Sequence, residues 1–431
     1  MTEAFLQYVW QHQLMCQDKL FTTSNEKIQV VKIGTFNSNA GPDFLNAKIK
    51  IGDTLWAGDV EIHIKSSDWN THGHQAQKSY NSVILHVVAI HDKEIQTNNG
   101  IQIPTLILPI LPHVKHNFTT FSDMTGKINC SSHLKTIDPS RIAIFLERLV
   151  AERFEEKTLH VVELYKKSNC DWEETFYQLL ARNFGAKQNQ EGFELLAKSL
   201  PQRIIAKHRG NLFQIEAMLF GQANLWTDSP DEYEQELRKE YKFLQKKYDL
   251  TPISPTWWKF ARMRPSSFPT IRIGQFAKLM NSSHSLTSKI LTCKNYEDLK
   301  PLLYCSTSSY WEQHYTFGTI SAKHSTQIGK TMLETLAINA VIPFLFTYGK
   351  AHDNDDLRQR AYNILLSLPP EKNNIISQWN TCGIQTKTAF DTQGLLQLFN
   401  SYCTKGNCVH CSIGHIVLNK KLIGIKTETT Y

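Results

Sequence analysis

The chain has 431 residues, of which 41% are hydrophobic and 20% charged, and its formal net charge is +7. This composition is that of a globular protein, and the length allows two or three domains. No stretch approaches the roughly eighteen uncharged apolar residues that cross a membrane, and the N-terminus lacks the basic start and cleavage site of a signal peptide. We therefore expect a cytoplasmic protein with no membrane partner. The mild basic excess permits a nucleic-acid partner without indicating one.

The N-terminal quarter of the chain predicts an α+β domain. Apolar residues at helical spacing near the N-terminus predict an amphipathic helix. Five segments rich in β-branched residues then predict strands: KIQVVKI, AKIKI, TLWAGDVEIHIK, SVILHVVAIH and IQIPTLIL. Together these segments predict a mixed sheet.

From Asp138 onward the apolar residues recur with a helical period. Asp138 suits an N-cap and Pro139 suits a first helical residue. Helical patterns continue from there, with a clear example in TMLETLAINAVIPFLFTYG. The predicted domains are an α+β domain over 1–125, a mostly α-helical domain over 126–375 with a loop at 250–274, and a cysteine-rich segment over 376–431.

One predicted strand, GDVEIHIK, carries a row of ionisable side chains at every second position. The four residues are Asp59, Glu61, His63 and Lys65. Alternation along a strand places such side chains on one face of the sheet. The row is therefore either a solvated outer face or the floor of an active site.

The spacing around this strand resembles that of metal-dependent phosphodiesterases of the PD-(D/E)xK class. In that class an Asp at a hairpin start and an acid on the next strand hold Mg²⁺, and a lysine two residues further on positions and helps deprotonate water. Asp43 and Glu61 match the two acids, and His63 stands where lysine is usual. Lys65 is the candidate substitute for that lysine, and Asp59 is the alternative acid. The resemblance implies a restriction-endonuclease-like sheet domain and a Mg²⁺-dependent nuclease.

A second interpretation of the same region is a zinc hydrolase. The loop SSDWNTHGHQAQKSY adds Asp68, His72 and His74, and the next strand adds His86. Imidazole is a common zinc ligand, so these three histidines and His63 form a rival metal site. A third interpretation is a non-catalytic module that binds nucleic acid or protein.

Several motifs taken together resemble an uncharacterised bacterial family, domain of unknown function 2851. They are NAGPDF, GDVEIHIKSSDW, HGH followed by YNSVILHVV, the central RMRPSSFPTIR and the terminal YCTKGNCVHCSIG. The resemblance extends over essentially the full length of the chain. It implies membership of a family but no activity.

The segment WWKFARMRPSSFPTIR mixes aromatic with basic residues. Arginine binds phosphate in a bidentate manner, and aromatic rings stack on exposed bases. The candidate substrate contacts are Trp257, Arg262, Arg264 and Arg272. The alternative is a rigid, proline-rich loop whose arginines pair with acids at a domain interface.

The C-terminal segment carries the strongest metal signal in the sequence. Its cysteines follow the pattern Cys403-x4-Cys408-x2-Cys411. Three thiolates this close together suit zinc or an iron–sulfur cluster, and either centre needs a fourth ligand. The candidates for the fourth ligand are Cys382, which completes an all-thiolate set, His410, His415 and the distant Cys16. We expect such a metal to clamp the segment structurally.

Overall fold

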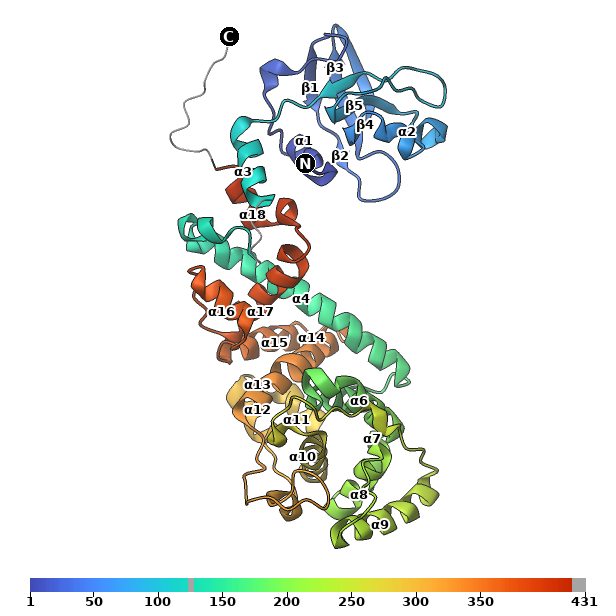
Figure 1. The fold of residues 1–431 in the computed structure, drawn as a ribbon, viewed down its shortest axis with the longest axis vertical. Helices are drawn as coiled ribbons and strands as arrows, with labels where there is room; N and C mark the ends of the chain where they lie inside the picture. The colour runs from blue at the N-terminus through green and yellow to red at the C-terminus, as the bar shows by residue number, and fades with distance from the viewer. Residues whose placement is uncertain (123–127, 421–431) are drawn as a thin grey trace. The chain divides into compact units, whose positions relative to one another are not determined.

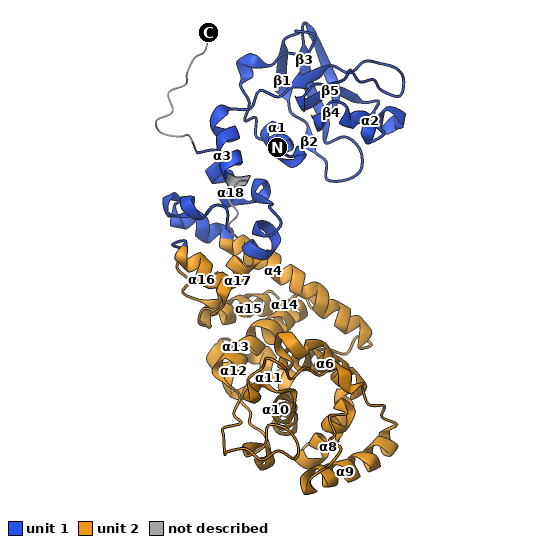
Figure 2. Cartoon of the chain, viewed as in Figure 1, with its two compact units in different colours: residues 1–145, 382–384, 398–431 blue, residues 146–381, 385–397 orange. Residues whose placement is uncertain are grey.

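The computed structural model describes residues 1–122 and 128–420. These residues form two compact units (Figure 2). Unit 1 comprises 1–145, 382–384 and the chain from 398, and unit 2 comprises 146–381 and 385–397. Unit 1 contains a mixed sheet and unit 2 is helical, so the predicted α+β class is confirmed. The predicted domain limits at 125 and 375 stay a prediction.

A mixed sheet forms the centre of unit 1 (Figure 1). The strand order is β1-β3-β4-β5-β6, with β2 paired to β3. Strand β4 is antiparallel to β3 and parallel to β5, and β5 is parallel to β6. The strands are β1 (Ile28–Lys32), β2 (Thr35–Phe36), β3 (Phe44–Ile51), β4 (Thr54–Lys65), β5 (Val83–Ile90) and β6 (Thr105–Ile107).

Short helices accompany the sheet in unit 1, and α1 and α2 pack on β4. Helix α1 packs on β4 and begins where the Thr2 hydroxyl accepts a hydrogen bond from the Phe5 amide. Helix α18 packs on α3, although the two are far apart in sequence. The side-chain amide of Asn117 on α3 donates to the carbonyl oxygens of Val417 and Leu418 over 3.1 and 3.0 Å. The helices are α1 (Glu3–Gln11), α2 (Asp68–Thr71), α3 (Pro112–Ser122) and α18 (Ser412–Leu418).

Unit 2 is built from helices around one apolar core. Its first helix, α4 (Pro139–Lys167), begins at the predicted proline, with the Asp138 carboxylate accepting from the Ser140 amide over 2.9 Å. The first residues of α4 belong to unit 1. The other helices are α5 (Trp172–Phe184), α6 (Ala186–Ser199), α7 (Gln202–Ala206), α8 (Leu212–Ala223), α9 (Glu232–Tyr248), α10 (Pro269–Ser282), α11 (Leu286–Thr292), α12 (Tyr296–Leu303), α13 (Lys330–Leu336), α14 (Ile342–Ala351), α15 (Asp355–Ser367), α16 (Asn374–Thr381) and α17 (Ala389–Leu398).

One helical stretch, Lys330–Ala351, is long and apolar enough to cross a membrane by length and composition. It comprises α13, a π-helical turn and α14. Within unit 2, 78% of its most apolar window is buried. The stretch therefore serves as a core helix, as in soluble proteins.

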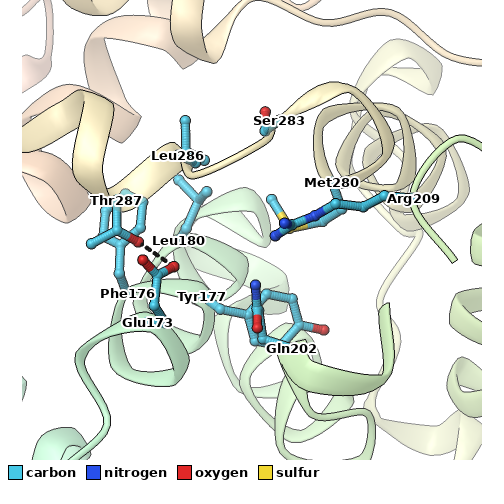
Figure 3. Close-up of a pocket in the computed structure, with 10 residues that line it drawn as sticks. All are labelled: Glu173, Phe176, Tyr177, Leu180, Gln202, Arg209, Met280, Ser283, Leu286 and Thr287. Atoms are coloured by element: carbon cyan, nitrogen blue, oxygen red, sulfur yellow. Dashed lines mark hydrogen bonds between the residues drawn. The ribbon is translucent and has the colours of Figure 1, made fainter. Parts of the chain in front are cut away.

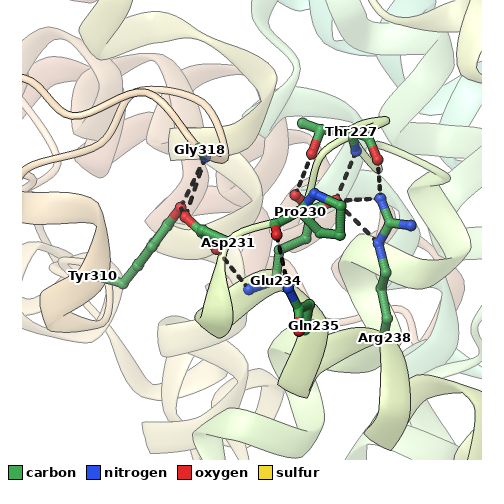
Figure 4. Close-up of polar contacts among 8 residues, drawn as sticks. All are labelled: Thr227, Pro230, Asp231, Glu234, Gln235, Arg238, Tyr310 and Gly318. Carbon is green, nitrogen blue, oxygen red and sulfur yellow. Dashed lines mark hydrogen bonds and ion pairs between the residues drawn. The ribbon is translucent and has the colours of Figure 1, made fainter.

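A polar network fixes the start of α9 in unit 2 (Figure 4). The Asp231 carboxylate caps the helix by accepting from the Glu234 amide over 2.9 Å, and it also accepts from the Tyr310 hydroxyl. The buried Glu234 carboxylate accepts from the Thr227 amide over 2.7 Å and pairs with Arg238. Both carboxylates of this turn thus have hydrogen-bond partners, and Asp231 supplies the cap that a helix start requires.

Candidate metal centre

The middle of strand β4 is enclosed on both faces. Glu61 is 5% exposed and His63 is 1% exposed, whereas Asp59 is half-buried and Lys65 is exposed. The predicted row of ionisable residues thus continues from a buried centre to a solvated end. For Glu61 and His63 the interpretation as a solvated face is wrong, and burial of polar groups like these requires partners.

Three histidines converge above the centre of the strand. The nitrogen donor atoms of His63, His72 and His74 all lie within 4.8 Å of one another. Nε2 of His63 is 3.1 Å from Nδ1 of His72. The Glu61 Oε1 atom lies 3.5 Å from Nε2 of His63 and 3.3 Å from Nε2 of His74. His72 is exposed, so the cluster is open to water on that side.

The HGH turn places two of these histidines. His72 ends α2, and Gly73 adopts φ +74°, a left-handed conformation that glycine accepts without steric cost. The chain then turns into the short 3₁₀ helix that begins at His74. The Asp68 carboxylate accepts from the Lys65 amide over 2.9 Å and thereby ties the start of this turn to the end of β4.

The separations match the coordination geometry of a small metal ion. Bonds of about 2.0–2.1 Å to a tetrahedral zinc ion place its nitrogen ligands about 3.3–3.4 Å apart. The 3.1 Å between Nε2 of His63 and Nδ1 of His72 lies near that value. The Glu61 oxygen lies beside the imidazoles, 3.5 Å from His63 and 3.3 Å from His74. Zinc sites with three protein ligands keep a fourth position for water.

His86 supports the cluster from the neighbouring strand. A hydrogen bond of 2.8 Å joins its Nε2 atom to Nδ1 of His63. Burial and the neighbouring histidines lower the pKa of His63 to about 2, and burial followed by His74 and His91 lowers that of His86 to about 3. Both rings are therefore neutral at physiological pH, the state in which imidazole binds metals.

Two aromatic rings restrict the imidazole orientations. The Tyr80 ring stacks on His74 with 3.8 Å between the ring centroids. Trp69 meets His74 and His86 edge-on, at 5.3 and 5.6 Å between centroids. Trp69 and Tyr80 also belong to a small apolar cluster with residues of the β5–β6 region, which fixes them in turn.

The two predicted acids lie side by side. The Asp43 amide donates to Oε2 of Glu61 over 3.0 Å, and the Asp43 carboxylate accepts from the Ile62 amide over 3.0 Å. Gln7 on α1 donates to the other Asp43 oxygen over 2.9 Å. Burial and the Glu61 charge raise the pKa of Asp43 to about 7. A cation beside these two carboxylates would relieve this repulsion.

Helix α1 contributes two residues that the sequence did not single out. Gln7 holds Asp43, and the Glu3 carboxylate lies within electrostatic reach of His72, Asp68 and Glu61. Glu3 and Gln7 are four residues apart and share one face of the helix. Their spacing in the sequence predicts that the two side chains share a helix face. Only the packing of α1 on β4 shows that this face lies against the candidate site.

Other predicted residues of this region have structural partners. The two Asp59 oxygens accept from the Asn46 amide over 2.9 Å and from the Ser82 hydroxyl over 2.6 Å. Asp59 thus ties β3 and β4 to the start of β5. Asp59 does not belong to the converging set, and Lys65 is exposed at the end of β4.

The predicted substrate contacts lie in unit 2. Trp257, Arg262 and Arg264 are exposed. Arg272 lies on α10, where its guanidinium donates to the Gln275 side chain over 2.9 Å and burial lowers its pKa. A role of these residues in binding nucleic acid stays a prediction.

The cysteines of the predicted C-terminal metal site all lie in unit 1. Among the candidates for the fourth ligand, Cys382 and Cys16 are half-buried, and His410 is exposed. Nδ1 of His415 forms a 2.7 Å hydrogen bond with the Tyr8 hydroxyl of α1. His415 therefore already has a partner on another helix.

A pocket in unit 2 is too small to bind a substrate (Figure 3). Its cavity volume is about 20 Å³, which is room for about one water molecule. The Thr287 hydroxyl donates to the Glu173 carboxylate over 2.7 Å at its edge. The lining residues are Glu173, Phe176, Tyr177, Leu180, Gln202, Arg209, Met280, Ser283, Leu286 and Thr287.

Comparison with known proteins identifies the family but no activity. Neither a curated protein nor a solved structure matches the chain. The sequence model of one family matches residues 3–374, which include the whole histidine and carboxylate cluster but end before Cys403. The chain belongs to this family, whose description is protein of unknown function (DUF2851).

Proposed function

We propose that the cluster on β4 is the active site of a metal-dependent hydrolase, with a transition metal such as zinc held by His63, His72 and His74. The observation that carries this proposal is the convergence of three imidazole nitrogens within 4.8 Å, beside a buried carboxylate. Imidazole favours zinc, iron and copper, whereas Mg²⁺ prefers an all-oxygen set. The donor atoms therefore favour zinc over the Mg²⁺ that the strand spacing predicted.

The remaining residues take distinct roles in this proposal. A metal in this position would lower the pKa of a bound water toward 7. Glu61 lies against two of the histidines and would accept the proton of such a water. The Nδ1 atom of His63 is held by His86 and its Nε2 atom faces His72, so we assign His63 as a ligand through Nε2 rather than as the general base.

We propose phosphodiesters of nucleic acid as the substrate class. This proposal is supported by the pairing of the two acids, since Asp43 directly precedes β3 and Glu61 faces it on the antiparallel strand β4. The net charge of +7 suits a polyanionic substrate. The nine cysteines form no disulfide among the described residues, which suits the reducing cytoplasm that we propose as its location.

A second candidate function rests on the carboxylates alone. Asp43 and Glu61 would hold Mg²⁺ as in PD-(D/E)xK nucleases, and the raised pKa of Asp43 favours a cation beside it. The two candidates differ in what the exposed His72 does. It is a ligand in the zinc hydrolase and dispensable in the magnesium nuclease.

The test combines metal content with hydrolysis by the full-length protein. Elemental analysis measures bound metal, and bis(4-nitrophenyl) phosphate, single-stranded DNA and RNA serve as substrates. The zinc proposal expects His72→Gln and His74→Gln to lose metal and activity together. Glu61→Gln should lose at least a hundredfold in rate while the fold stays intact.

His91→Gln is the matched control, because His91 pairs with Glu94 outside the converging set. It should keep both metal and activity. Mg²⁺-dependent cleavage that survives His72→Gln but not Asp43→Asn would reject the zinc hydrolase in favour of the magnesium nuclease. Binding of nucleic acid without turnover in Zn²⁺, Mn²⁺ or Mg²⁺ would reject both and favour a non-catalytic module.

A further inference from the structure

A second cavity in unit 2 is large enough to hold a small ligand. Its volume is about 230 Å³, whereas that of the pocket in Figure 3 is about 20 Å³. Helices α4, α5, α6 and α14 and the π-helical turn Ala337–Val341 supply its walls. Such π-helical turns are frequent at functional sites. The polar lining residues are Lys157, His160, Arg182, Asn183, Gln190 and Asn339.

The lining of this cavity is basic. Of the described residues that form it, two are basic, one is a histidine, three are amides and none is acidic. The Lys157 ammonium donates to Oδ1 of Asn339 over 3.0 Å and to the Ile338 carbonyl over 3.2 Å, both in the π-helical turn. It also donates to Oε1 of Gln393 over 3.1 Å. These acceptors are neutral, so they orient the ammonium without neutralising its charge.

The charge of Lys157 is incompletely balanced inside the fold. Burial followed by the charge of Arg153 lowers the pKa of Lys157 to about 7, and the charge of Glu371 opposes this shift only in part. A lowered pKa means that the folded protein disfavours the ammonium form. An anion in the cavity would stabilise that form by its opposite charge.

Two other basic groups of the lining have capacity for a ligand. Arg182 on α5 pairs with Glu194, which also pairs with Lys198. A guanidinium has five N–H donors, so one carboxylate partner leaves several of them for a ligand. His160 lies on α4 one turn after Lys157, and its Nε2 atom is buried without a hydrogen-bond partner among the described residues. Since buried polar atoms usually have partners, this nitrogen indicates a missing acceptor beside the cavity.

One wall of the cavity is held in place by Asn183. Its side-chain amide donates to the Leu179 carbonyl over 2.8 Å and to the Asn339 carbonyl over 3.2 Å. The second bond ties the π-helical turn to α5. The cavity is therefore formed before a ligand enters, as most sites for small ligands are.

We infer that this cavity binds one small phosphate anion, either inorganic phosphate or the phosphate group of a monoester, between Lys157 and Arg182. Arginine binds phosphate through two parallel hydrogen bonds, and lysine acts on it as a point charge. The donors come from α4, α5 and, through the Gln190 amide, α6. A tetrahedral phosphate presents oxygens in several directions and can meet all three helices, whereas the two oxygens of a carboxylate lie in one plane.

This site is independent of the proposed hydrolase site. Every residue that lines the cavity belongs to unit 2, and the histidine cluster belongs to unit 1. The volume of about 230 Å³ lies below the roughly 300–1,000 Å³ of pockets for drug-sized ligands. The ligand is therefore small, and a polynucleotide would enter at most by a terminal phosphate.

The experiment measures phosphate binding by the full-length protein with isothermal titration calorimetry. The His74→Gln background is used, so that a metal at the histidine cluster does not bind the phosphate. We expect one phosphate per chain with a Kd of about 1 mM or below. Arg182→Leu should weaken the affinity at least about tenfold, because charged hydrogen bonds are lost. Arg182→Lys should recover part of it, since it keeps the charge but not the planar fork.

The other variants separate the cavity from general charge. Lys157→Met should also weaken phosphate binding at least about tenfold, and urea unfolding verifies that the variant is folded. His160→Leu replaces it in the comparison if Lys157→Met does not fold. Lys187→Met is the matched control, because it removes one positive charge at an exposed position on α6. It should bind phosphate as tightly as the parent protein.

The choice of anion identifies the source of the phosphate. Tighter binding of glycerol phosphate than of inorganic phosphate would support the inference and identify a monoester as the ligand, and the reverse order would identify inorganic phosphate. Three results would overturn the inference. They are the absence of binding up to about 10 mM phosphate, an affinity unchanged by Arg182→Leu and Lys157→Met, and acetate bound as tightly as phosphate.

Discussion

The Nδ1 atom of His63 lies 2.8 Å from the Nε2 atom of His86, across the parallel pair of strands β4 and β5. A His63 ring that offers its Nε2 lone pair to a metal carries its proton on Nδ1. This N–H group then donates a hydrogen bond to Nε2 of His86. Such a second hydrogen bond fixes the tautomer and the orientation of a metal-binding histidine. His86 is thus a positioning residue for the proposed centre.

Replacing His86 by Leu should weaken zinc binding by about 10- to 100-fold, since His63 then loses the acceptor for its Nδ1 proton. Zinc titration against a chelator of known affinity measures the effect. His86→Gln offers an amide oxygen near the former Nε2 position and should recover most of the loss. Equal zinc affinity in His86→Leu and wild type would show that His86 does not position His63.

Asp59 should prove structural. Asp59→Ala removes the acceptor of the Asn46 amide and the Ser82 hydroxyl, so we expect a loss of about 1–2 kcal/mol in the free energy of unfolding. The metal content should stay at the wild-type level. Denaturant unfolding and elemental analysis of the same preparation check both. Loss of metal with unchanged stability would show that Asp59 is a metal ligand.

The turn before α9 should be sensitive to a single buried carboxylate. Glu234→Ala removes the acceptor of the Thr227 amide and the ion-pair partner of Arg238, which keeps only its hydrogen bond to the Thr227 carbonyl (Figure 4), and we expect a loss of about 2–4 kcal/mol in the free energy of unfolding. Glu236 is exposed on the same helix, so Glu236→Ala is the control and should change little. Similar losses in the two variants would contradict a specific role of the network.

Lys157 should make the stability of unit 2 depend on pH. Its ammonium donates to neutral acceptors on Asn339 and Gln393, and burial together with Arg153 lowers its pKa to about 7. Between this value and the ordinary pKa of 10.5 the unfolded chain binds more protons than the folded chain. The contribution of Lys157 to stability therefore rises with pH across that window, by at most about 1.4 kcal/mol per pH unit.

Lys157→Met removes this dependence. Compared with wild type, the variant should be relatively more stable at pH 7 than at pH 9, as measured by urea unfolding at both values. Lys187→Met, at an exposed position, should show the same difference from wild type at both values. A constant difference between Lys157→Met and wild type would show that Lys157 keeps an ordinary pKa in the fold.

Local patterns predicted the elements of this fold well. Strand β4 appears where the alternation of GDVEIHIK placed it, and α4 begins at Pro139, because period and capping depend on neighbouring residues alone. The same alternation set Glu61 and His63 on one face. It could not tell that Lys65, two residues further, points into solvent, since burial depends on which elements cover the strand.

By itself, the sequence determined the α+β class, the family, and the histidine-rich strand and turn that supply the proposed ligands. Tertiary structure alone decided that Gln7 holds Asp43 and that the Tyr8 hydroxyl meets His415. Tyr8 and His415 are separated by 406 intervening positions in the printed chain. Contacts over such separations leave no periodic mark in the sequence, because they arise only when packed elements bring distant segments together.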